Sequence, residues 1–315
     1  MKLETVRALA QSLLFASSLL LARTPAVAAE TKPYLMAVLG DSIPAGFLAN
    51  THLLGGFIPV PEKGNFGWPS SPKDLLENKR TLSWASGTKQ LSHFVFLTHY
   101  LNRTEPGAKL EVANFAKFGA QTKDVIGQAN QLAEALATGK YRSLKYLVLM
   151  VGVNDMCALE PQGGIPEDQV ASNLSTIFSK IAETKQDEPI RILFVGMGRV
   201  ADLGKDFIRK NKTYGGMTCG KWYDSVVDLC RQFTTWKTPD EYQSLLKYIA
   251  KRNQNLKEAG EEAMRRHSHL KVHFSSQHYE APVFPQALAH DCFHPNREAQ
   301  AVLSSRTWAE QPWFK

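Results

Sequence analysis

Four short segments, spread from the start to the end of the chain, contain the residue types that acyl transfer requires: Gly-Asp-Ser at 40–42, Asn-Phe-Ala-Lys-Phe-Gly at 114–119, Gly-Val-Asn-Asp at 152–155 and Asp-Cys-Phe-His at 291–294. A serine hydroxyl becomes an effective nucleophile when a base takes its proton. Histidine suits this role near neutral pH, and a carboxylate can hold its tautomer and stabilise its protonated form. We therefore predict Ser42 as nucleophile, His294 as base and Asp291 as the group that orients the base.

The reaction also needs hydrogen-bond donors for the negative charge that develops on the carbonyl oxygen. The backbone N–H groups of Ser42 and Gly119 and the side-chain amide of Asn154 could supply them. Gly119 suits this role because a residue without a Cβ lets a substrate approach its amide closely. Two alternatives stay open: Gly119 as a plain glycine at a helix entry, and Asn154 as a cap of the loop after a strand.

Three more residues of these segments are predicted to support the site rather than to react: Asp41, Gly152 and Asp155. Asp41 is positioned to cap the turn or helix behind the serine. Asp155 is expected to brace the loops through hydrogen bonds. The chemistry needs no organic cofactor and no metal ion, and neither is predicted.

Segments with strand and helix patterns alternate along the chain, which indicates a parallel sheet with helices on both faces. Strands are expected at 34–39, 109–114, 146–151, 191–195 and 269–274, and helices at 91–102, 122–138, 167–184, 240–266 and after Pro295-Asn296. Each candidate segment follows a predicted strand. Because ligands bind at the carboxyl ends of the strands in an open α/β sheet, the four segments are expected to meet at one edge.

These four blocks, in this order, resemble those of the SGNH hydrolases, also called the GDSL-type esterase/lipase family. The Ser, Gly, Asn and His for which that family is named, and its aspartate, match Ser42, Gly119, Asn154, His294 and Asp291. The resemblance implies a three-layer α/β/α, flavodoxin-like fold with a mainly parallel central sheet. It also implies ester hydrolysis by a Ser-His-Asp triad through an acyl-enzyme. The first block departs from the family pattern in reading Gly-Asp-Ser-Ile rather than Gly-Asp-Ser-Leu.

The substrate prediction depends on a shorter likeness. Leu-Ser-Trp-Ala-Ser-Gly at 82–87 resembles a segment of the phospholipase B-like branch, which implies a lipid or lysophospholipid ester and contact with a membrane surface. An aromatic-rich insertion at about 47–90 could line such a site or simply pack onto the body, and a second insertion spans about 198–239. Alternatives are a glycan O-acetyl esterase, an acyltransferase, a non-catalytic binding module and a structural envelope protein.

The first 28 residues have the pattern of a secretory signal peptide. Lys2 and Arg7 precede an apolar stretch at 8–22, and Ala26-Val27-Ala28 is typical of a cleavage site. Cleavage after Ala28 would leave residues 29–315 as a single exported domain, in a periplasm or outside the cell. An uncleaved N-terminal anchor is the alternative.

Charge and cysteine content limit the remaining classes. The formal net charge is +7, but Lys and Arg are scattered, so a nucleic-acid partner is not expected. An even number of cysteines in an exported chain favours two disulfides, with three pairings open, among Cys157, Cys219, Cys230 and Cys292. A zinc site is disfavoured because the chain has no Cys-x-x-Cys pair.

Overall fold

The computed structural model describes residues 31–52, 56–57, 80–157, 164–184, 186–213, 216–225 and 230–315. The predicted signal peptide at 1–28 lies outside the described residues, as does most of the predicted insertion at 47–90. The described parts of that insertion include a hairpin of β2 (Thr51–His52) and β3 (Gly56–Phe57), and the short helix η1 (Arg80–Leu82). Within the described ranges, no helix is both long and apolar enough to cross a membrane.

Five parallel strands form the central sheet in the order β4-β1-β5-β6-β7. This is the strand order of flavodoxin-like sheets. The strands are β1 (Tyr34–Gly40), β4 (Leu110–Asn114), β5 (Leu144–Met150), β6 (Ile190–Val195) and β7 (Leu270–Ser275). All five predicted strands are confirmed, although β5 begins two residues earlier than expected.

Strand β1 illustrates how the sheet is buried on both faces. All seven of its residues are buried. Successive side chains of a strand point to opposite faces, so β1 contributes to two separate cores. One core receives Leu35, Ala37 and Leu39, and the other receives Tyr34, Met36 and Val38.

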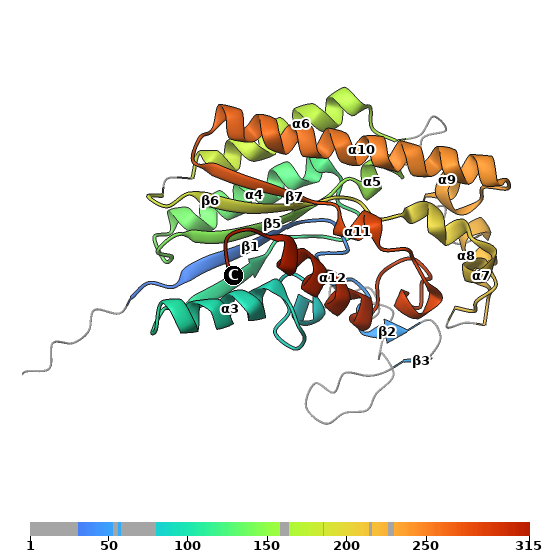
Figure 1. Cartoon of the computed structure of the whole chain (residues 1–315), viewed down its shortest axis with the longest axis horizontal. Coiled ribbons are helices and arrows are strands. Elements are labelled where there is room, and N and C mark those ends of the chain that lie inside the picture. The colour runs from blue at the N-terminus through green and yellow to red at the C-terminus, as the bar shows by residue number, and fades with distance from the viewer. Residues whose placement is uncertain are drawn as a thin grey trace, which may run out of the picture. The chain divides into compact units, whose positions relative to one another are not determined.

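Helices cover both faces of the sheet and give the three layers seen in Figure 1. One face carries α4 (Thr122–Ala137), α6 (Glu167–Ala182) and α10 (Pro239–Arg266), and the other carries α3 (His93–Thr104) and α12 (Arg297–Glu310). The α10 helix begins at a capping box formed by Thr238 and Glu241, followed by a proline at its first position. The predicted α/β/α fold is confirmed.

The described residues of the second insertion, at 198–239, include short helices that the sequence did not predict. They are η2 (Val200–Gly204), α7 (Asp206–Arg209), α8 (Cys219–Ser225) and α9 (Arg231–Thr234). Three other short elements lie next to the strand ends: α5 (Val153–Met156), α11 (Gln277–Glu280) and η3 (Pro285–Ala287). Helices this short contain too few turns to produce a recognisable periodicity.

Candidate active site

Ser42 lies on a sharp turn directly after β1, here called the nucleophile turn (residues 40–44). Gly40 has a φ of +142°, and a Cβ there would lie 1.9 Å from the carbonyl oxygen of Met150 on β5. The side-chain amide of Gln128 on α4 accepts from Gly40 N–H at 2.7 Å and donates to Gly40 C=O at 2.9 Å. Asp41 N–H donates to Met150 C=O at 3.2 Å. The sheet and α4 therefore fix this turn through its backbone.

The Asp41 carboxyl is fully buried in the nucleophile turn. Its Oδ1 accepts a hydrogen bond from Ile43 N–H at 3.0 Å, while Oδ2 has no hydrogen-bond partner among the described residues. Burial raises the pKa of Asp41 to about 7, and the charge of Asp155 adds to the shift. The bond from Ile43 and the nearby His294 lower this pKa and only partly offset the effect of burial.

The segment Asp-Cys-Phe-His at 291–294, here called the base loop, brings two side chains into line with Ser42. His294 Nε2 lies 2.7 Å from Ser42 Oγ, and His294 Nδ1 lies 2.5 Å from Asp291 Oδ2. Asp291 Oδ1 accepts from the backbone N–H groups of Phe293 and His294, both at 3.0 Å. Burial alone would raise the pKa of Asp291, but the His294 ring and these bonds bring it below its ordinary value. The carboxylate is thus ionised and holds the imidazole by its Nδ1 side.

The candidate oxyanion donors lie after β4 and β5, the two neighbours of β1. Gly119 has a φ of +73°, and a Cβ there would meet no described atom within 4 Å. The glycine is therefore needed for its left-handed backbone, and the space in front of its amide is open. Asn154 Nδ2 donates to Ala120 C=O at 3.0 Å, which joins the two loops and leaves a second amide hydrogen.

Among the residues predicted to support the site, Asp155 connects two of its loops through hydrogen bonds. Asp155 is buried and accepts from Thr122 N–H at 3.1 Å and from Thr122 Oγ1 at 2.6 Å, so it ties the Asn154 loop to the start of α4. Burial raises the pKa of Asp155, and its bonds with Thr122 oppose that rise. Gly152 has a φ of +128°, and a Cβ there would lie 2.9 Å from Met197 Sδ.

The Leu-Ser-Trp-Ala-Ser-Gly segment at 82–87 holds the nucleophile turn from the α3 and α12 side. Ser83 Oγ donates to Pro44 C=O at 2.7 Å. The Gln300 amide of α12 accepts from Trp84 N–H at 2.9 Å and donates to Ile43 C=O at 3.2 Å. Trp84 is fully buried, so this aromatic residue of the first insertion packs into the body.

An aromatic pair beside the base was not anticipated from the sequence. The Phe47 ring lies 4.8 Å from the His294 ring in an edge-on arrangement, and Phe118 lies 4.4 Å from Phe47. Phe118 remains 47% exposed, although it is a large apolar side chain. The sequence signal that could have placed Phe118 at the site is its position immediately before Gly119.

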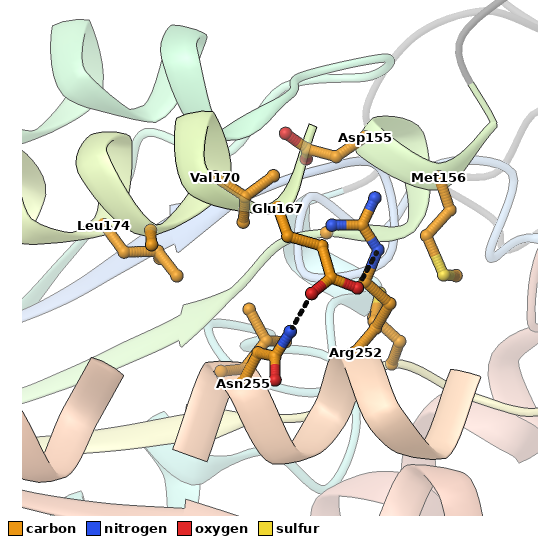
Figure 2. A pocket seen from close by; sticks show the side chains of 11 residues that line it. Asp155, Met156, Glu167, Val170, Leu174, Arg252 and Asn255 are labelled. Carbon is orange, nitrogen blue, oxygen red and sulfur yellow. Dashed lines mark hydrogen bonds and ion pairs between the residues drawn. The ribbon is translucent and has the colours of Figure 1, made fainter. Parts of the chain in front are cut away.

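Two cavities differ in what they could bind. One cavity has a volume of about 20 Å³ and is lined in part by Asp155 and Met156. Figure 2 shows its lining, where Glu167 lies between Arg252 and Asn255. This cavity has room for about one water molecule. A larger, mainly apolar cavity of about 450 Å³ is lined by Ile43, Val153 and Phe293, the chain neighbours of Ser42, Asn154 and His294. Its volume lies in the range of small-molecule sites.

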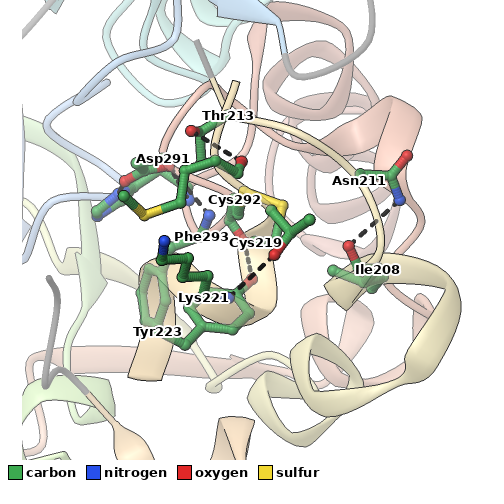
Figure 3. Close-up of a disulfide and its surroundings, with 12 residues drawn as sticks. Ile208, Asn211, Thr213, Cys219, Lys221, Tyr223, Asp291, Cys292 and Phe293 are labelled. Atoms are coloured by element: carbon green, nitrogen blue, oxygen red, sulfur yellow. Dashed lines mark hydrogen bonds and ion pairs between the residues drawn. A yellow bond between two sulfur atoms is a disulfide. The ribbon is translucent and has the colours of Figure 1, made fainter. Parts of the chain in front are cut away.

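Two disulfides connect the second insertion to the loops of the site. The predicted number of disulfides is confirmed, and the pairing is Cys157–Cys230 and Cys219–Cys292. Figure 3 shows the second disulfide, which joins Cys219 of α8 to Cys292 of the base loop. In the described part of the chain, no group of three or more His, Cys, Asp and Glu side chains could hold a metal ion.

The chain is similar to one known protein family and to several solved structures. The model of the GDSL-like lipase/acylhydrolase family matches residues 36–307. Similar solved structures include TesA (14% identity, 88% of this chain and 97% of that chain, TM-score 0.41). Others are Axe2, an acetylxylan esterase from Geobacillus stearothermophilus (14%, 90% and 96%, 0.44), and the psychrotrophic esterase EstA from Pseudoalteromonas sp. (10%, 88% and 95%, 0.42). No curated protein matches the chain.

Proposed function

The chain belongs to the GDSL-like lipase/acylhydrolase family, and from that premise we propose that it is an exported serine hydrolase that cleaves carboxylic esters through an acyl-enzyme. The observation that carries the proposal is the line of contacts from Asp291 through His294 to Ser42, at 2.5 Å and 2.7 Å. The distance from Ser42 to His294 is within the hydrogen-bond reach of a nucleophile and its base, and His294 is in turn bonded to Asp291.

In the proposed reaction, Ser42 Oγ attacks the ester carbonyl while His294 Nε2 takes its proton. Asp291 stabilises the imidazolium that forms. The N–H groups of Ser42 and Gly119 and the second amide hydrogen of Asn154 donate to the oxyanion. His294 then protonates the leaving alcohol, and a water molecule repeats the sequence to release the acid.

For the substrate we propose a lipid or lysophospholipid acyl ester. The apolar cavity beside the site supports an apolar acyl chain, because burial of each CH₂ contributes about 0.8 kcal/mol. The exposed Phe118 ring, next to the base, supports contact with a lipid chain or a membrane surface. Two disulfides support export to an oxidising compartment, a periplasm or the cell exterior.

The test compares the purified, disulfide-bonded protein with its Ser42→Ala variant on three kinds of substrate. These are lysophospholipids, acetylated xylan fragments and p-nitrophenyl esters whose acyl chains have about two to sixteen carbons, so that chain-length specificity can be measured. We expect release of fatty acid by the wild type and a loss of at least about 10³-fold in the variant. Equal activity of the two proteins would refute the mechanism.

The same panel separates the alternatives by the product released. Acetate from acetylated xylan alone would replace the lipid substrate with a glycan ester. Products that form only when an alcohol acceptor is added would indicate acyl transfer. Binding of an ester without release of acid would indicate a non-catalytic module.

A further inference from the structure

The insertion at residues 198–239 is covalently joined to both loops that flank the serine. Cys230 pairs with Cys157, which ends α5 three positions after Asn154. Cys219, the first residue of α8, pairs with Cys292 inside the base loop. Each bond joins residues 73 positions apart, so both bonds are long-range links between loops.

Hydrogen bonds repeat the same two connections. Gln232 Nε2 of α9 donates to Met156 C=O at 2.6 Å, next to Cys157. The Tyr223 hydroxyl of α8 donates to Cys292 C=O. Tyr223 is 1% exposed, and burial together with the charge of Asp291 raises its pKa far above the ordinary value, so the phenol keeps its proton and donates. Figure 3 shows Tyr223 and Cys219, both from α8, beside Cys292.

The base loop has a conformation that needs such support. Cys292 has a φ of +61°, in the left-handed region that a residue with a Cβ adopts at a cost of about 1–2 kcal/mol. The loop turns there, so that Asp291 Oδ1 accepts from the N–H groups of Phe293 and His294. Cys292 is held at three points: its N–H donates to Ala289 C=O, and its carbonyl and its sulfur are both bound by α8.

We propose that α8 is a brace for the base loop, in which Tyr223 and the Cys219–Cys292 disulfide are positioning residues that hold Asp291 and His294 in line with Ser42. Their bonds to the base loop are made at Cys292, between Asp291 and His294. An error of about 1 Å in the position of a catalytic group can lower a rate about 10²-fold, so a brace of this kind would act on turnover more than on substrate binding. The inference rests on the proposed function.

The first test is Tyr223→Phe, which removes one oxygen and keeps the ring. Its matched control is Tyr146→Phe, because Tyr146 is equally buried and its hydroxyl bonds His93 Nδ1 at 2.9 Å, in the core between β5 and the helices α3 and α12. We expect kcat for an ester to fall about tenfold in Tyr223→Phe with KM unchanged, because the loss of such a bond is worth up to about 1.4 kcal/mol, which is tenfold in rate. The control should keep the wild-type kcat. Equal kcat values in all three proteins, or equal losses in both variants, would overturn the proposal.

A second measurement follows Ser42 directly. The rate at which an alkyl p-nitrophenylphosphonate modifies Ser42 needs the base but not the release of an acid. We expect this rate to fall about tenfold in Tyr223→Phe and further in a Cys219→Ser/Cys292→Ser double variant. An unchanged rate in both variants would refute the brace while Ser42→Ala remained inactive. Full activity of Ser42→Ala would instead refute the proposed function.

Discussion

The nucleophile turn and the base loop meet at one point but are held there by different means. The turn follows β1, a central strand, and its backbone bonds to β5 and α4 position Ser42. The base loop follows β7 at the edge of the sheet, three strand spacings or about 14 Å from β1. It must cross back to Ser42, and it carries a left-handed Cys292 and a disulfide to α8. The nucleophile is therefore positioned by the sheet, whereas the base is positioned by a loop that depends on added links.

The strongest way to break the first region is Gly40→Ala. The new Cβ would lie 1.9 Å from Met150 C=O, and the residue would have to keep a φ of +142°. Since the clash is with backbone of the central strand β5, we expect a loss of at least about 4 kcal/mol in unfolding free energy, measured by urea denaturation.

Gly107→Ala is the matched control for this change. Gly107 also has a positive φ, +88°, but a Cβ there would meet no described atom within 4 Å. The unfolding free energy of Gly107→Ala should fall by only about 1–2 kcal/mol. Similar losses in both variants would mean that β5 does not constrain the nucleophile turn as the structure indicates.

Asp41→Asn tests the buried carboxyl of the same turn through pH. The pKa of Asp41 is raised to about 7 from an ordinary 3.8, so between these values the folded protein keeps a proton that the unfolded chain has lost. The unfolding free energy therefore falls as the pH rises through this window, by up to about 4 kcal/mol at about 1.4 kcal/mol per pKa unit.

The Asn variant has no such proton to lose. Its stability relative to the wild type should increase from pH 4 to pH 8, as measured by denaturation at each pH. A difference between the two proteins that stays constant with pH would contradict a raised pKa at Asp41.

Sequence reasoning succeeds for the first region and only partly for the second, for a physical reason. Apolar runs such as residues 34–39 identify buried strands, and ligands bind at the carboxyl ends of the strands in an open α/β sheet, so the edge at which Ser42 lies is predictable. The disulfide partners of Cys219 and Cys230 depend on how short helices without clear periodicity fold, so three pairings stayed open. Gln128 and Phe47 were missed because nothing local marks a contact made across the fold.

Gln300 allows a smaller and sharper test, because it joins the nucleophile turn to α12, the helix that follows the base loop. In Gln300→Leu the buried N–H of Trp84 and C=O of Ile43 both lose their side-chain partner. We expect a loss of about 2–3 kcal/mol in unfolding free energy. Gln311→Leu is the control, because Gln311 is a buried glutamine just after α12 whose side-chain amide bonds the backbone of Trp313 and Phe314, away from the nucleophile turn.

Measurements of the unfolding free energy and of kcat in Gln300→Leu and Gln311→Leu decide how far the sheet alone positions the serine. If the bonds to β5 and α4 suffice, Gln300→Leu should keep kcat within about tenfold of the Gln311→Leu value, because the loss of one such anchor is worth about 1 kcal/mol to the turn. A fall of about 10²-fold or more in Gln300→Leu alone would mean that Ser42 also depends on α12. In that case the nucleophile turn and the base loop would share one support, and the contrast between a sheet-held serine and a loop-held histidine would no longer stand.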